Sequence, residues 1–166
     1  KRSCERFRPG AQNLSVEEGI FPYLINWACM DPEQELSNRQ NMSAEHLLNL
    51  RIESVRTLYS LTLENLEIQM MHSASVLKRA IHSYIESRKK FESLQEGMCK
   101  WFGAIVSGIY DQQILFTELG GFEDVLIDSV KHGKAPLRGQ ALLALSELVD
   151  ANGEVKDRIY PSKVLN

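Results

Sequence analysis

The chain has 166 residues, of which 43% are hydrophobic and 25% charged, a balance typical of a folded domain rather than of a disordered chain. The formal net charge of -3 argues against nucleic acid as the main partner, and the lack of any run of eighteen apolar residues predicts that no segment spans a membrane. Three widely separated cysteines favour reduced thiols, and hence a cytoplasmic or nuclear protein, over a disulfide framework.

The N-terminal part of the chain begins with a basic lead-in at residues 1–9, which a proline-glycine pair separates from the predicted helices. A short helix is predicted over residues 11–18 and a second helix over residues 20–29, with Gly19 at the corner between them. Residues 31–43 are polar and contain an early proline, so they predict a loop insertion.

The middle of the chain predicts one long helix and two shorter helical segments. Ser43 is a suitable N-cap for the long helix, whose apolar side chains recur at three- and four-residue steps. This apolar face consists of Leu48, Ile52, Val55, Leu58 and Leu61. Shorter segments follow at residues 65–74, where we expect Met70 and Met71 in the core, and at residues 76–85.

The last third of the chain carries the clearest helix signals. A long amphipathic helix is predicted over residues 91–105, and a short helix follows from its predicted N-cap, Asp111, to residue 118. Gly120 and Gly121 then allow a sharp corner, because glycine tolerates positive φ and the close approach of helices. Another helix follows the corner and ends at Gly133, and Pro136 suits the first turn of a third.

The apolar pattern repeats at a constant interval. Corresponding leucine and phenylalanine positions in the long helices, Leu58, Phe102 and Leu145, are 44 and then 43 residues apart. The interval from Leu24 to Ile81 is 57 residues, and its surplus of 13 falls where the loop insertion lies. A period in the low forties with three helical segments is typical of armadillo and HEAT repeats.

The order of short helix, Gly120-Gly121 corner, second helix and long third helix resembles the armadillo-repeat family. HEAT repeats share the period, but the short helix before the corner favours armadillo over HEAT, and a helical bundle with coincidental spacing is the alternative. The resemblance implies an all-α, right-handed, armadillo-like solenoid of about three repeats. The predicted repeat domain covers residues 10–166. Its units are residues 10–63 with the insertion at 31–43, residues 64–108, residues 109–152, and the start of a further repeat at 153–160.

In armadillo proteins the third helices line a concave binding face, and the resemblance places the same face on this chain. Its partner-binding residues are then predicted to be Asn49, Glu53, Arg56, Ser60, Lys100, Gln140, Leu143 and Glu147. Members that hold extended basic peptides use an asparagine where this chain has Ser60, Ala104 and Glu147. Alanine offers no side-chain hydrogen bond, so the mixed charges favour a folded domain or a helix as partner.

The predicted function is a non-catalytic scaffold or adaptor that binds a protein on this face or through the acidic loop from Asp31 to Glu45. One alternative is a chaperone cofactor or allosteric regulator that grips a nucleotide-binding partner. A less favoured alternative is a nucleic-acid binder that uses the basic patch of Arg88, Lys89 and Lys90. Neither end shows a polar capping repeat, which favours a segment of a longer protein and self-association through the ends.

The sequence contains no pattern of catalytic residues, phosphate-binding loop or metal ligands, so we expect neither enzyme activity nor a cofactor or metal. The four histidines have no metal-ligand spacing, and each is expected to be partly exposed on a helix. Cys99 is expected to be a buried structural cysteine, and the turn at residues 88–90 a solvated connection between helices.

Overall fold

A computed structural model describes residues 19–30, 43–88, 90–150, 153 and 156. All regular secondary structure in these residues is helical, which confirms the predicted all-α class. The basic lead-in, the predicted helix at residues 11–18, the insertion after residue 30, Lys89 and most of residues 153–160 lie outside the described residues.

The helices follow the predicted order. The described elements are α2 (Ile20–Ala28), α4 (Ala44–Thr62), α5 (Leu66–Met70), α6 (Ala74–Glu86), α7 (Glu92–Val106), α8 (Tyr110–Glu118), the π-helix η1 (Gly121–Ile127), α9 (Asp128–His132) and α10 (Ala135–Val149). The long helices α7 and α10 both have 15 residues and both begin and end 43 residues apart. The ends of α4 and α7 are 44 residues apart.

Local sequence explains where the helices begin. Ser43 accepts a hydrogen bond from the His46 backbone N–H at 3.2 Å, so it caps α4 as predicted. Pro136 lies in the first turn of α10, where its missing N–H leaves no intrahelical hydrogen bond unmade. Asp111 was predicted to cap α8, but α8 begins at Tyr110 and its N-cap is Ile109, two residues before Asp111. Asp111 is therefore inside the first turn, where its charge favours the positive helix end.

The corners between helices use left-handed backbone at repeated positions. Gly19 precedes α2 with φ of 74° and Gly120 precedes η1 with φ of 87°. Glu64 and Gly108, which are 44 residues apart, follow α4 and α7 with φ of 54° and 71°. Glu64 is the one residue other than glycine with positive φ in the described part of the chain. The chain thus makes the same turn twice with two different residues.

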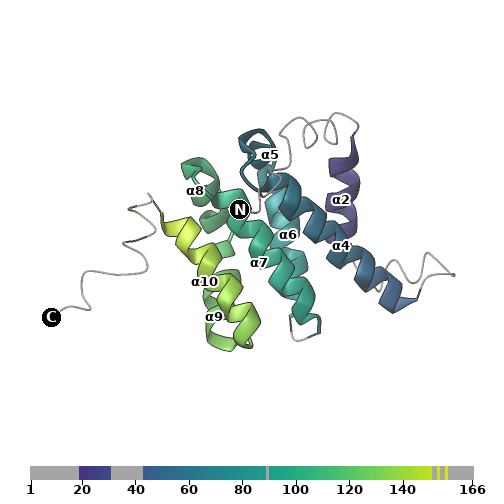
Figure 1. The fold of residues 1–166 in the computed structure, drawn as a ribbon. Helices are drawn as coiled ribbons and strands as arrows, with labels where there is room; N and C mark the ends of the chain where they lie inside the picture. Colours follow the sequence, from purple (N-terminus) through teal and green to yellow (C-terminus); the bar gives the residue numbers. More distant parts are fainter. Residues whose placement is uncertain (1–18, 31–42, 89, 151–152, 154–155, 157–166) are drawn as a thin grey trace, which may run out of the picture.

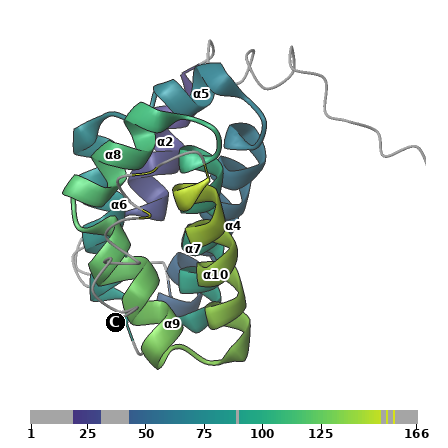
Figure 2. The same ribbon diagram turned by 90° about the vertical axis from the view of Figure 1, so that its left-hand side faces the viewer.

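The three long helices lie side by side, with α7 between α4 and α10 (Figure 1). In the view of Figure 2 these three helices lie on one side and α6 and α8 on the other, with α2 packed against α4. Gly103 allows the close approach of α7 and α10, since an added Cβ would lie 3.3 Å from the Ala144 backbone. The arrangement gives one continuous outer face of three helices.

The core lies between the two sides and is dominated by α7. Its largest fully buried side chains include Trp101, Phe102, Phe116 and Tyr84. The Trp101 and Phe102 rings stack with centroids 5.9 Å apart, and the Phe102 and Phe116 rings are tilted at 5.2 Å. These contacts join α7 to α6 and α8 and hold the outer helices in place.

His72 is fully buried, so the expectation that each histidine is partly exposed is wrong for this residue. The Trp101 Nε1–H donates to His72 Nε2 at 3.1 Å, so the proton of the neutral ring lies on Nδ1, which donates to the Ile68 carbonyl at 2.8 Å. Burial lowers the pKa of His72 from 6.5 to about 4. The histidine therefore acts as a neutral polar part of the core.

Two buried glutamines tie the short helices to the ends of the long ones. Gln69 Nε2 on α5 donates to the Ala104 carbonyl at 2.6 Å and to the Ser107 carbonyl at 3.1 Å. Gln113 Nε2 on α8 donates to the carbonyls of Glu147 at 3.1 Å and Asp150 at 3.2 Å. The same amide also lies 3.1 Å from the Val106 carbonyl. The two glutamines are 44 residues apart, so this contact recurs with the helices.

The predicted burial of Met70 and Met71 is wrong, because they are 53% and 39% exposed. The reason is the direction of α5, which turns Ile68 and Gln69 toward the core. Leu66 and Met70 are one helical turn apart and therefore share the opposite, outward face. Five residues are too few for apolar periodicity to show which face is buried.

Candidate functional site

The predicted binding residues lie on the outer surface of α4, α7 and α10, which we call the three-helix face. Seven of the eight predicted residues are exposed, and Gln140 is half-buried. The four residues on α4 follow at helical steps, so they form one stripe along it. All eight thus lie on the three long helices and none of them is buried, although the structure does not bring them into one site.

A shallow pocket of about 210 Å³ lies on this face where the three helices run together. Four predicted residues line it: Lys100, Gln140, Leu143 and Glu147. Sequence reasoning missed Tyr59 and Leu63, which contribute its α4 side. Leu143 is 62% exposed and Leu63 42% exposed, so the pocket has an apolar rim in contact with solvent. Hydrophobic side chains at a charged edge are typical of a protein contact.

The charged residues of the three-helix face have different partners. Glu147 accepts a hydrogen bond from Ser107 Oγ at 2.6 Å, which fixes its carboxylate beside α7. Arg56 and Glu53 form an ion pair at 2.5 Å, with both side chains 64% exposed, so the pair contributes little to stability. Asn49, Glu53, Arg56 and Ser60 do not line the pocket, and they belong to the solvated part of the three-helix face.

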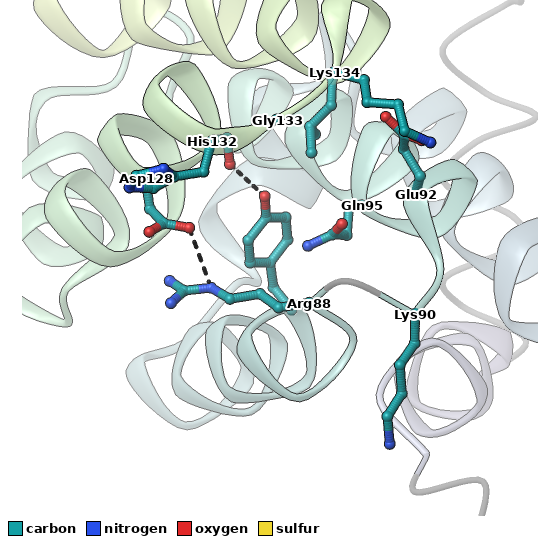
Figure 3. Close-up of a pocket in the computed structure, with 11 residues that line it drawn as sticks. Arg88, Lys90, Glu92, Gln95, Asp128, His132, Gly133 and Lys134 are labelled. Carbon is teal, nitrogen blue, oxygen red and sulfur yellow. Dashed lines mark hydrogen bonds and ion pairs between the residues drawn. The ribbon is translucent and has the colours of Figure 1, made fainter.

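A second and larger hollow, of about 770 Å³, lies where α6 and α9 end and α7 and α10 begin (Figure 3). We call it the turn pocket. It is lined by Tyr84, Arg88, Lys90, Glu92, Gln95, Asp128, Ser129, His132, Gly133, Lys134 and Leu137. Its volume lies within the range of small-molecule sites in proteins. No sequence motif marks it, because its walls come from the ends of four separate helices.

The rim of the turn pocket carries charges of both signs. Arg88 is half-buried, donates to the Asp124 carbonyl, and lies with Nε 3.4 Å from an Asp128 carboxylate oxygen. Lys134 Nζ lies 2.7 Å from Glu92 Oε2, and this hydrogen bond raises the pKa of Lys134. The predicted solvated turn is therefore partly structural, since Arg88 fastens it to α9. Lys90 is exposed, and Lys89 lies outside the described residues.

The floor of the turn pocket is a chain of buried hydroxyl groups. Ser129 Oγ donates its only proton to the Val125 carbonyl, so the hydroxyl of Tyr84 must donate to Ser129 Oγ. Burial raises the pKa of Tyr84, which keeps its hydroxyl protonated. Gln95 also lines the pocket and is 6% exposed, and its amide forms no hydrogen bond with any described residue.

The corresponding place between α2, α4 and α6 is filled instead by Arg51, which is 44 residues before Gln95. Arg51 is 3% exposed. Its guanidinium donates to the Ala28 carbonyl at 3.4 Å and to Ser83 Oγ at 2.8 Å. We call this place the filled junction and the turn pocket the open junction. The 44-residue spacing of Arg51 and Gln95 was visible in the sequence, but polar residues were not compared at that interval.

The described residues include no group of three or more histidine, cysteine, aspartate or glutamate side chains that could hold a metal ion. Cys99 is buried, as expected, and burial raises its pKa to about 12, so its thiol stays protonated at neutral pH. Burial likewise raises the pKa of Cys29 to about 11. None of the helices described here has the length and apolar character needed to cross a membrane.

Comparison with known proteins finds no match to this chain among protein-family models, curated proteins or solved structures.

Proposed function

We propose that the chain is an armadillo-like solenoid that acts as a non-catalytic scaffold and binds a protein partner on the three-helix face. The observation that carries the proposal is the shallow pocket beside Lys100 and Glu147, with Leu143 and Leu63 exposed at its rim. Large exposed apolar side chains gathered at one pocket favour a binding surface over a solvated one.

Repetition of local structure supports the solenoid part of the proposal. The equal lengths of α7 and α10 and the left-handed corners at Glu64 and Gly108 recur at intervals of 43 and 44 residues. The glutamine contacts to the helix ends recur at the same interval. Units that repeat their bounds, corners and polar contacts are expected to stack in one direction.

The chemistry of the pocket favours a partner helix with an apolar side chain next to charged ones. One such side chain would enter between Tyr59 and Leu143, where it removes apolar area from water. An acidic group on the same helix would face Lys100, and a basic group would face Glu147. Helices that place apolar anchors into a groove are a common mode of recognition.

The proposal is tested by comparing two exposed leucines. Leu143→Asp places a charge in the pocket, whereas Leu66→Asp changes an equally exposed leucine on α5, since the two are 62% and 64% exposed. Proteins captured from cell extract by the wild-type chain are identified, and the affinity of each purified partner is then measured for both variants. We expect Leu143→Asp to weaken binding by at least about tenfold, which corresponds to about 1.4 kcal/mol.

Charge reversal gives a second arm of the test. Lys100→Glu changes a residue that lines the pocket, and Arg56→Glu changes a residue on α4 outside it. We expect the first to weaken partner binding more than the second, with circular dichroism unchanged for both. Equal affinity of the wild type, Leu143→Asp and Lys100→Glu, all folded, would remove the three-helix face as the binding site.

A further inference from the structure

The turn pocket is a separate place from the three-helix face and has the features of a binding site for a small molecule. It is about 770 Å³ in volume, and its lining joins an apolar side chain, Leu137, to several polar groups. Ligand sites of this size combine apolar walls with a few polar groups that converge on the ligand. The polar groups of the turn pocket indicate which ligand it suits.

The first such group is Gln95, whose amide lacks a partner within the described residues although the residue is only 6% exposed. Figure 3 shows the Gln95 side chain among the other residues that line the pocket. The amide therefore has donors and an acceptor that the chain itself leaves available to a ligand. The equivalent Arg51 meets its acceptors within the chain itself.

The electrostatic field in the turn pocket favours an anion. Among the lining side chains, Arg88, Lys90 and Lys134 are positive, and Glu92 and Asp128 are negative. The helices α7 and α10 both begin at the pocket, and within the described residues no side chain caps either N-terminus. Free N–H groups at the start of a 15-residue helix carry partial positive charge. Lys90 points away from the pocket in Figure 3, so it acts only through its field.

Glu92 adds a requirement for a hydrogen-bond donor. Its Oε2 is held by Lys134 at 2.7 Å, while its buried Oε1 has no hydrogen-bond partner in the described chain. A fully deprotonated anion such as sulfate cannot donate to this oxygen, whereas a ligand hydroxyl can. Arg88 Nε likewise lacks a hydrogen bond, because its contact with Asp128 is an ion pair without hydrogen-bond geometry.

We propose that the turn pocket binds a small organic oxyanion, a phosphate or carboxylate compound that also carries hydroxyl groups. The oxyanion lies near Lys134, Arg88 and the start of α10, and accepts a hydrogen bond from the Gln95 amide. A ligand hydroxyl donates to Glu92 Oε1. This site works independently of partner binding on the three-helix face.

The test uses four probes of graded chemistry, namely glycerol 3-phosphate, glycerate, sulfate and glycerol. Binding is followed by calorimetry and by the Gln95 side-chain NH₂ resonances in nitrogen-proton NMR spectra. We expect glycerol 3-phosphate or glycerate to bind at least about tenfold more tightly than sulfate, because sulfate has no proton to donate to Glu92. Which of the two binds more tightly identifies the phosphate or carboxylate source. Glycerol alone is expected not to bind.

Matched variants separate this site from adventitious anion binding. Lys134→Ala removes a lining cation and is expected to weaken binding about tenfold, while Lys131→Ala removes an exposed cation that does not line the pocket and is expected to change nothing. Gln95→Leu keeps the volume of the side chain but removes the amide, and it is expected to weaken binding to a similar extent.

A further variant, Gln95→Arg, imitates the filled junction and is expected to abolish probe binding while the circular dichroism spectrum stays native. The proposal is overturned if neither organic anion binds, or if binding is unaffected by Gln95→Leu and Lys134→Ala in folded protein. It is also overturned if Lys131→Ala weakens binding as much as Lys134→Ala, because the anion would then respond only to surface charge.

Discussion

The filled junction and the open junction occupy equivalent places between neighbouring sets of helices, yet one is closed by the chain and the other is hollow. From α4, Arg51 donates hydrogen bonds to the Ala28 carbonyl at the end of α2 and to Ser83. Gln95, at the equivalent position on α7, has a shorter side chain and forms no side-chain hydrogen bond with the described residues around its own junction. The two equivalent positions thus hold a side chain bonded within the chain in one case and a side chain that lines a cavity in the other. Repeated architecture therefore allows a binding site to arise where one unit lacks a filling residue.

The largest expected effect is on the filled junction. Arg51→Ala removes the donor to the Ala28 carbonyl and to Ser83 and leaves empty space, so we expect it to lower the free energy of unfolding by about 3–4 kcal/mol. Urea denaturation measures this change. Arg56→Ala, an exposed arginine on the same helix, is the control and is expected to cost less than about 0.5 kcal/mol. Equal costs for the two arginines would show that the filled junction contributes nothing.

A second contrast concerns His72, which follows α5, and Phe116, which lies within α8. Both side chains are fully buried, and the two positions are 44 residues apart. The folded pKa of His72 is about 4, below its unfolded value of 6.5, so folding favours the neutral ring. Its contribution is therefore complete above pH 6.5 and is lost as the pH falls toward 4. We expect a loss of about 3 kcal/mol across this window, measured by denaturation at several pH values.

The control for this contrast is His72→Phe, which places at position 72 the phenylalanine found at position 116. Its stability is expected to depend less on pH between 6.5 and 4 than that of the wild type, although it also loses the hydrogen bond from Trp101. The same slope in both proteins would mean that another group causes the acid sensitivity.

The smallest expected effect sharpens the comparison of the two corners. Glu64 adopts the left-handed backbone that Gly108 adopts 44 residues later. Glu64→Gly removes the strain of a Cβ at positive φ. It is expected to raise the free energy of unfolding by about 0.5–1 kcal/mol, which thermal unfolding detects as a higher midpoint temperature. Glu64→Ala loses the same side chain but keeps a Cβ, so it should give no gain. A gain from alanine would point to the lost charge rather than to the backbone.

The helices were predictable because they depend on local chemistry. Ser43, Gly120 and Pro136 mark helix starts through hydrogen bonding and backbone preference, and the structure has helices at those positions. The outward direction of Met70 was not predictable, because it depends on which face of a short helix meets α7. The turn pocket was not predictable either, since it depends on the space that Gln95 leaves unfilled among four helix ends.

The three-helix face stands between these cases. Its residues follow from helical periodicity once the long helices are aligned, which is why none of the predicted set is buried. The pocket within it depends on the contact between α7 and α10, where Gly103 meets Ala144, and this contact has no local signature. Comparing polar residues at the 44-residue interval would have identified Gln69 and Gln113 in advance.

The Gln113 amide affects how a partner would bind to the outer helices. It contacts the end of α7 through Val106 and the end of α10 through Glu147 and Asp150, so sliding one helix along the other would break bonds to both. The helices that carry Lys100 and Glu147 are therefore held in a fixed position relative to each other. A partner helix would meet a binding surface that is already formed, and we expect its association to cost this protein little conformational entropy.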